Sequence, residues 1–397
     1  MKKFKILISA MFFCFAATIS AQSLWNKDHL KEVKQSISSS KYAQAYKHLL
    51  ESADRELSNP PLSVMMKDKT PASGSKHDYM SIGRYYWPDP TKSDGKPYIN
   101  RDGVSNPELE KLDRVRLGKM ADAVTTLSLA YYLSNNEKYA AKATENIRVW
   151  FMNKETKMNP NLNYAQTVPG RFNDRGRCYG VIDTYSFVEM LEGVQLLAKS
   201  KSFTDKDEKA LKEWFGQLVQ WLVSSDLGQE ESNSANNHGL AYDVQLVSFA
   251  IYTGNYKLAN KVLDAFPQRR LYKQIEPDGS QPLELKRTLA FGYSEFNIHH
   301  MIDMFFYAKA LNRPKLYLTK SEDGRSFLKA VDFLTPYLGK KVTEWPYQQI
   351  SEWNAKQQAF CDDLYRISLL TPSRTDYLKL YKMHKEIHPT DRNILLY

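Results

Sequence analysis

Cysteine and glycine are scarce in this sequence of 397 residues, which contains 3 cysteines and 17 glycines. Outside the N-terminal segment only Cys178 and Cys361 remain, far apart and without the spacing of a zinc site. Two such thiols cannot build a disulfide framework, so we expect both to be buried and free. The composition is otherwise that of an ordinary globular protein, and the length fits one large domain or two moderate ones.

Long apolar runs are absent after the first residues, so no transmembrane helix or membrane anchor is expected in the rest of the chain. At the N-terminus, three lysines precede an apolar run from Ile6 to Ile19, and small residues follow. This pattern predicts a signal peptide over residues 1–21, cleaved after Ala21, and a periplasmic or secreted protein. Cys14 lies inside the run without a lipobox, which argues against a lipoprotein.

Nucleic-acid-binding motifs are also lacking, although the formal net charge is +10. The predicted signal peptide accounts for three of these positive charges, so the exported chain stays basic. A basic exported protein without such motifs favours an acidic polysaccharide as its partner over nucleic acid. The 25 tyrosines and 7 tryptophans suit this partner, because flat rings stack on sugar faces. The alternative is that most of these rings belong to the core.

Strand signals are few, and helical periodicity dominates the sequence. Thr204 followed by Asp207 has the pattern of a helix start. No strict repeat consensus is present, which disfavours a tetratricopeptide array. Recurrent helix pairs with short connections predict an all-α protein, and we favour an α/α toroid, an incomplete barrel of antiparallel helix pairs, as a single domain over residues 22–397. Apolar stripes predict helices near 120–131, 140–150, 181–191, 211–222, 240–252, 258–266, 296–311, 327–338 and 354–370.

The sequence does not predict helices in two long segments, Asp68 to Pro107 and Asn159 to Gly180. Both are rich in proline, glycine, asparagine and aromatic residues. Long irregular segments in a compact domain are often functional loops. We therefore expect these two segments to contribute to a binding site.

Two short motifs contain residues suited to chemistry. Residues 234–239 read Ser-Ala-Asn-Asn-His-Gly just before an apolar helix, where backbone donors and the helix dipole favour an anion. The alternative is an ordinary helix cap followed by a structural histidine. The second motif places Arg287 six residues before Tyr293. Arginine is a natural clamp for a carboxylate, although an amphipathic helix end with Tyr293 in the core would look the same.

Together with two loop segments, these motifs resemble the alginate lyase superfamily, specifically polysaccharide lyase families 5 and 38. The resemblance runs from Leu57 to Leu370 and is closer to family 38, whose members adopt an α/α toroid. It implies a lyase that cleaves a uronate-containing polysaccharide, most of all alginate, by β-elimination. The matching pieces are SANNHG, ELKRTLAFGYSEFN, YYWPDP and PGRFNDRGRCYGVIDT at 169–184.

The chemistry of β-elimination explains the residue types that the resemblance implies. Removing the C5 proton of a uronate builds charge on the adjacent carboxylate, which Asn237 and Arg287 would neutralise with help from His238. For mannuronate the proton and the departing O4 lie on the same face, so Tyr293 could act as both base and acid. For guluronate they lie on opposite faces, so His238 would be the base and Tyr293 the acid. We expect Arg287 to lower the pKa of Tyr293.

Further residues are expected to bind the substrate, and no metal or other cofactor is expected. Arginines of the glycine-rich loop would bind carboxylates at neighbouring subsites, and Glu284 would orient Arg287. His299-His300 lies on an apolar helix and is interpreted as structural, because the sequence identifies no further metal ligands. The expected substrate-binding residues are His77, Tyr79, Tyr86, Trp87, Arg171, Arg175, Asn236 and Glu284, with Arg177 in the same loop as Arg175.

Three alternatives remain at this stage. A lyase for glucuronan or a glycosaminoglycan would need the same catalytic residues. An α/α-toroid glycoside hydrolase would need two placed carboxylates. Glu284, Asp243 and Asp183 are candidates for these, but no pair stands out. A non-catalytic glycan-binding protein would explain the aromatic and basic loops, but not the combination of Asn-Asn-His with Arg287 and Tyr293.

Overall fold

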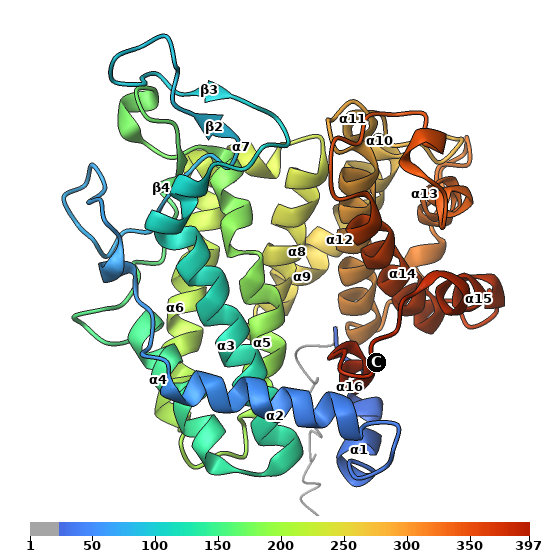
Figure 1. Ribbon diagram of the computed structural model, residues 1–397, viewed down its shortest axis with the longest axis horizontal. Helices are drawn as coiled ribbons and strands as arrows, with labels where there is room; N and C mark the ends of the chain where they lie inside the picture. Colours follow the sequence, from blue (N-terminus) through green and yellow to red (C-terminus); the bar gives the residue numbers. More distant parts are fainter. Residues whose placement is uncertain (1–23) are drawn as a thin grey trace, which may run out of the picture.

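The computed structural model describes residues 24–397, so the predicted signal peptide lies outside the described residues (Figure 1). The first half of the described chain contains α1 (Lys27–Gln35), α2 (Ala43–Ser58), β1 (Met80–Ile82), β2 (Tyr86–Trp87), β3 (Ile99–Asn100), α3 (Asp113–Ser134), α4 (Glu137–Phe151), β4 (Tyr164–Thr167), α5 (Ser186–Leu196), α6 (Asp205–Ser224) and α7 (Asp226–Ser232). The second half contains α8 (Asn237–Tyr252), α9 (Tyr256–Phe266), α10 (Tyr272–Gln274), α11 (Pro282–Leu285), α12 (Ala290–Ala310), α13 (Phe327–Leu334), α14 (Trp353–Leu370), α15 (Thr375–His384) and α16 (Asn393–Leu396).

The predicted fold class is confirmed: the chain forms an α/α toroid of antiparallel helix pairs. The inner helices include α8 and α12, which are buried on nearly every side and pack against each other. The outer helices α6 and α9 are amphipathic and bury one face each against α8. Helices that are buried on nearly every side lie between other elements, which places α8 and α12 in the inner layer.

Local sequence signals set several helix boundaries. At α6, the Thr204 side chain accepts from the backbone N–H of Asp207, and Asp207 accepts from the backbone N–H of Thr204. This capping box was predicted from the sequence. At α13, the expected helix ends earlier, at Leu334, and a short 3₁₀ turn with Pro336 follows. Proline has no N–H to continue the helical ladder.

The two ends of the described chain meet at one side of the toroid. Helix α16 packs against α1 and α2 (Figure 1). The backbone N–H of Asn26 donates to the carbonyl of Leu396 at 3.2 Å. Helices α1, α2, α15 and α16 were not predicted from the sequence, because their apolar stripes are short.

The two irregular segments predicted as functional loops lie beside each other. Strand β1, from the first segment, pairs in parallel with β4, from the second. Strands β2 and β3 form a small antiparallel hairpin above the helices (Figure 1). These strands are only two to four residues long, so their pairing fixes the loops in place without adding a sheet to the core.

Cys178 and Cys361 are both buried and free, as predicted. Within residues 24–397, no helix combines the length and the apolar character that a membrane crossing requires.

Candidate active site

A cavity of about 440 Å³ opens where the first turns of three inner helices meet the β2–β3 hairpin and the loop after β4. It contains all four predicted catalytic residues. Four arginines line it against a single carboxylate, that of Asp102, which gives the cavity a strongly positive character. The lining consists of Arg84, Tyr85, Tyr86, Asn100, Asp102, Arg114, Gln166, Arg177, Tyr179, Ile182, Asn236, Asn237, His238, Arg287, Tyr293 and Phe296.

Asn237 begins α8 and is held there by Glu284. Asn236 caps the helix with its side chain, which accepts from the backbone N–H of His238. The buried Glu284 carboxylate accepts from the backbone N–H and from Nδ2 of Asn237, at 2.8 and 2.7 Å. Glu284 was expected to orient Arg287, but its hydrogen bonds go to Asn237 instead. Burial raises the pKa of Glu284, and the hydrogen bonds from Asn237 oppose that rise.

His238 is oriented by a buried carboxylate that the sequence analysis missed. Its Nδ1 lies 2.7 Å from Oε1 of Glu231, which is inaccessible to solvent. Because a carboxylate only accepts, this contact places a hydrogen on Nδ1, so Nε2 is the acceptor of the neutral ring. The ring of Tyr179 packs edge-on against the imidazole, with centroids 4.9 Å apart. A histidine fixed in this way is suited to accept a proton through Nε2.

Arg287 is anchored by Asp102, which arrives from the segment after β3. Nη2 and Nε of Arg287 donate to the two carboxylate oxygens of Asp102 at 2.6 and 3.2 Å. Asp102 also accepts from the side chain of Thr288. The two parallel bonds fix the plane of the guanidinium. Within residues 24–397, no hydrogen bond involves Nη1 of Arg287, so its two hydrogens are available for a ligand.

The Tyr293 hydroxyl lies between two partners. Arg287 donates to it from Nη2 at 2.8 Å, and the Tyr85 hydroxyl is 2.7 Å away. The guanidinium also stacks on the Tyr293 ring, 3.9 Å from its centroid. The sequence led us to expect a lowered pKa here. Instead, burial and the neighbouring Tyr85 raise the pKa of Tyr293 above its ordinary value, because together they outweigh the effect of Arg287.

Tyr86 and Asn236 line the cavity, in agreement with the sequence analysis. Of the three arginines in the glycine-rich loop, Arg177 is the one that reaches it. Its guanidinium stacks on Tyr86 and Tyr179, at 4.6 and 5.2 Å from the ring centroids. The two rings therefore fix the positive charge of Arg177 in the same cavity as His238, Arg287 and Tyr293.

The other predicted substrate-binding residues lie outside this cavity. Tyr79 is fully buried and donates to Asp183, so the prediction that it forms a subsite wall is wrong. His77 contacts the carbonyl of Lys157, and the Trp87 indole donates to Val104. The remaining two are Arg175, which pairs with Asp226 on the surface, and Arg171, which is exposed.

Several cavity residues were not singled out from the sequence. Arg114 stands second in α3, and its side chain is only 26% exposed. Tyr85 and Tyr179 lie in segments already noted for their aromatic content. Asp102, in the cavity lining, and Glu231, buried beside His238, had no distinguishing signal, because acids are common in the sequence and only the fold brings these two against Arg287 and His238.

The carboxylates considered for a hydrolase do not line the cavity, and each is engaged by other side chains. Asp243 is buried and paired with Arg270 at 2.7 Å. Asp183 accepts from Tyr79, Ser81 and Gln166. Glu284 holds Asn237. No pair of carboxylates therefore faces the cavity within residues 24–397, and glycoside hydrolysis by paired acids has no support in this geometry.

Comparisons with known proteins agree with one another. Residues 63–345 match a family described as alginate lyase. An alginate lyase from Bacteroides ovatus has 51% sequence identity and a TM-score of 0.93, with 95% of this chain and 98% of that chain covered.

Two more distant structures share the fold alone. Alginate lyase A1-III from Sphingomonas species A1 has 14% identity and a TM-score of 0.54, with 88% of this chain and 94% of that chain covered. A variant of alginate lyase A1-III in complex with a tetrasaccharide has 15% identity and a TM-score of 0.61, with coverage of 96% and 97%. The search of curated proteins gave no match.

The environment of Tyr293 predicts that its phenol stays protonated well above the pKa of about 10 that free tyrosine has. We expect the ultraviolet difference titration between the wild type and Tyr293→Phe to show the missing phenolate only at strongly alkaline pH. Tyr85→Phe should lower the pH at which the Tyr293 phenolate forms, because it removes one of the causes that raise the pKa of Tyr293. A phenolate near neutral pH in the wild type would contradict the assignment of burial as the dominant cause.

Proposed function

Since the chain belongs to the alginate lyase family, we propose that this polysaccharide lyase cleaves alginate by β-elimination and leaves unsaturated uronate ends. The observation that supports this proposal most is the arrangement of Asn237, His238, Arg287 and Tyr293 in one cavity rich in arginine. The positive character of the cavity suits a polymer with one carboxylate on each sugar.

The first task of the site is to bind and neutralise the carboxylate beside C5. We assign it to the Nη1 hydrogens of Arg287, with Asn237 beside them. Asp102 already fixes the plane of the guanidinium, so little conformational entropy is lost when the substrate binds. The dipole of α8 adds partial positive charge at its first turn, although the N–H groups of Asn237 and His238 already have side-chain partners. These groups lie where charge builds up as the C5 proton leaves, so they stabilise the transition state.

The second task is proton transfer, and we divide it between two residues. The raised pKa of Tyr293 suits the acid that protonates the departing O4. His238, whose Nδ1 is held by Glu231, presents Nε2 as the base that takes the C5 proton. This division serves guluronate, where the two groups act on opposite faces.

Mannuronate places both proton transfers on one face, and we assign them to Tyr293. The phenol must then lose its proton before it acts as a base. The hydrogen bond from Arg287 at 2.8 Å favours that step, because it stabilises the phenolate.

The proposal includes export of the enzyme. Cleavage of the predicted signal peptide after Ala21 would release residues 22–397 as a single catalytic domain into the periplasm or the medium. The arginines of the cavity would not strengthen the binding of a neutral glycan, whereas they would strengthen the binding of an acidic polysaccharide outside the cell.

The substrate assignment predicts which polymers react. Elimination leaves a conjugated double bond that absorbs ultraviolet light, and hydrolysis or simple binding does not. We expect rising absorbance on mannuronate and guluronate blocks, and a much lower rate on glucuronan and glycosaminoglycans. A higher rate on glucuronan than on alginate would indicate that glucuronan is the substrate. New reducing ends without a rise in ultraviolet absorbance would exclude a lyase.

Tyr293→Phe should lower turnover on alginate by at least the ~10²-fold typical of losing a positioned acid or base. The change removes one hydroxyl and keeps the ring, so the fold and the carboxylate contacts of Arg287 should persist. Tyr252→Phe is a matched control, since Tyr252 is buried outside the cavity and its hydroxyl has no partner within residues 24–397. Near-normal turnover in Tyr293→Phe, with unchanged helical circular dichroism, would overturn the assignment.

His238→Ala should reduce cleavage of guluronate blocks more than cleavage of mannuronate blocks, because only the guluronate route uses His238 as base. The two rates are measured on the same preparation, so a loss of folded protein cancels in their ratio. His48→Ala, which removes a histidine from the surface of α2, is the control. Equal losses on both blocks would instead assign His238 to binding the carboxylate or positioning Tyr293.

A further inference from the structure

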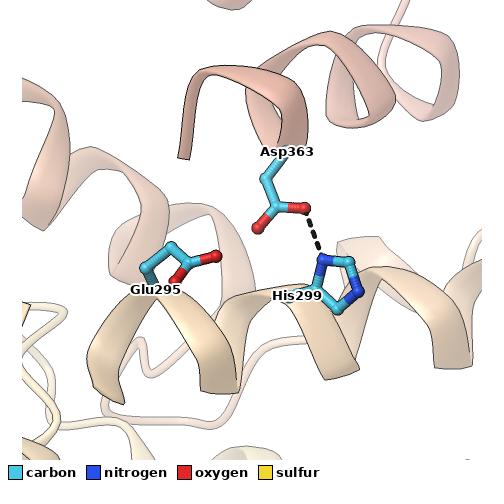
Figure 2. Close-up of side chains that lie close together, drawn as sticks. All are labelled: Glu295, His299 and Asp363. Carbon is cyan, nitrogen blue, oxygen red and sulfur yellow. Dashed lines mark hydrogen bonds and ion pairs between the residues drawn. The ribbon is translucent and has the colours of Figure 1, made fainter. Parts of the chain in front are cut away.

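A cluster of possible metal ligands lies between α12 and α14, outside the catalytic cavity. Glu295 and His299 stand one turn apart on the same face of α12, and Asp363 faces them from α14 (Figure 2). One potential ligand atom from each residue lies within 4.8 Å of the other two. The sequence analysis identified no further metal ligands beside His299, whereas the fold brings two carboxylates close to it.

The cluster contains a buried carboxylate oxygen without a partner. Oδ1 of Asp363 accepts from Nδ1 of His299 at 2.9 Å. Oδ2 of the same carboxylate is buried and has no hydrogen bond within residues 24–397, and Asp363 as a whole is only 1% exposed. Figure 2 shows this second oxygen on the side of Glu295. A buried oxygen with negative charge is costly unless something compensates it.

The carboxylate of Glu295 also has only a long contact with a positive charge. Its nearest cation, Nζ of Lys356, lies 3.4 Å from Oε2, which is at the long end for a charged contact. Arg366 makes its shortest ion pair with Asp303 at 2.5 Å, and its Nη1 lies 3.7 Å from Oδ1 of Asp363 and 3.4 Å from Nδ1 of His299. Neither Lys356 nor Arg366 makes a hydrogen bond to Oδ2 of Asp363, the oxygen on the side of Glu295.

The cluster lines a separate cavity of about 790 Å³ with an acidic character. This cavity contains six carboxylates against one lysine and two arginines, whereas the catalytic cavity has the opposite balance. A polyuronate would be repelled here and a cation attracted. The carboxylates belong to Glu189, Glu295, Asp303, Asp362, Asp363 and Asp391.

We propose that Glu295, His299 and Asp363 bind a divalent transition-metal ion of the zinc class, with water as a further ligand on the cavity side. One imidazole nitrogen and two carboxylate oxygens form a ligand set that suits zinc, whereas calcium and magnesium prefer oxygen alone. Zinc lies ~2.0–2.2 Å from such atoms. Tetrahedral ligands at that distance lie about 3.4 Å apart, so atoms now within 4.8 Å of one another must approach by up to about 1.4 Å, and His299 gives up its proton to do so.

The ion would join α12 to α14 close to the catalytic residues. Tyr293 stands two positions before Glu295 on α12, so an ion at Glu295 stabilises the helix that positions the Tyr293 hydroxyl. The site adds to the proposed lyase function and does not depend on it, since no step of the elimination uses the ion.

The competing interpretation is a closed network of salt bridges. Burial lowers the pKa of His299, but Asp363 and Asp303 raise it more, to about 9 overall. A protonated His299 could then balance the acids without a metal. The two interpretations differ in whether the folded protein binds one ion through these side chains.

The test uses the mature protein after dialysis against a chelator, with zinc chloride titrated in a calorimeter and the melting temperature followed in parallel. We expect one ion per chain and a rise in melting temperature, because an ion that binds only the folded state stabilises it. Glu295→Gln and Asp363→Asn should each weaken binding by at least tenfold. Glu189→Gln should bind as the wild type does, since Glu189 lines the same cavity but pairs with Arg392.

The absence of saturable zinc binding by the folded wild type would overturn the proposal, as would unchanged affinity in both variants. Tighter binding of calcium or magnesium would overturn the choice of ion class. Cobalt provides a second measurement on the wild type alone, in case a variant fails to fold. Its visible spectrum should report nitrogen and oxygen ligation at low coordination number, and a spectrum of hydrated cobalt would count against the site.

Discussion

The packing of α8 against α12 is the constraint on which the active site depends. Both helices are buried on nearly every side, so neither can rotate or slide without exposing apolar surface. In a toroid of alternating inner and outer helices, the inner helices run in the same direction and begin at the same rim. His238 in the first turn of α8 and Tyr293 in the first turn of α12 therefore meet at one cavity. Arg114 in the first turn of α3 joins them for the same reason.

A rim built from helix N-termini is electrostatically suited to an anionic ligand. The dipole of each helix places partial positive charge at its first turn, and four arginines add full charges. Carboxylates then fix individual side chains: Glu231 holds His238, Glu284 holds Asn237 and Asp102 holds Arg287. Glu231 and Glu284 are buried, whereas Asp102 lines the cavity as the partner of Arg287. The site thus stays positive overall while its donors remain fixed in direction.

Helix α12 separates two cavities with opposite charge. Phe296 lines both of them, and the polar residues on either side differ in sign. Tyr293 faces the arginine-rich cavity, and His299 faces the acidic one. The same helix therefore supports a site for a polyanion at its beginning and a site suited to a cation one to two turns later.

The sequence by itself determined the fold class, because the apolar stripes of helices such as α6, α8 and α12 are long and regular. It also singled out Asn237, His238, Arg287 and Tyr293 from short local motifs, and the fold brings these four residues to one cavity. Only the tertiary structure decided what these residues contact. Asp102 lies 185 positions from Arg287, and Asp363 lies 64 positions from His299, so no local pattern links them. The pKa of Tyr293 was misjudged for the same reason: the sequence shows the nearby arginine but not the burial that outweighs it.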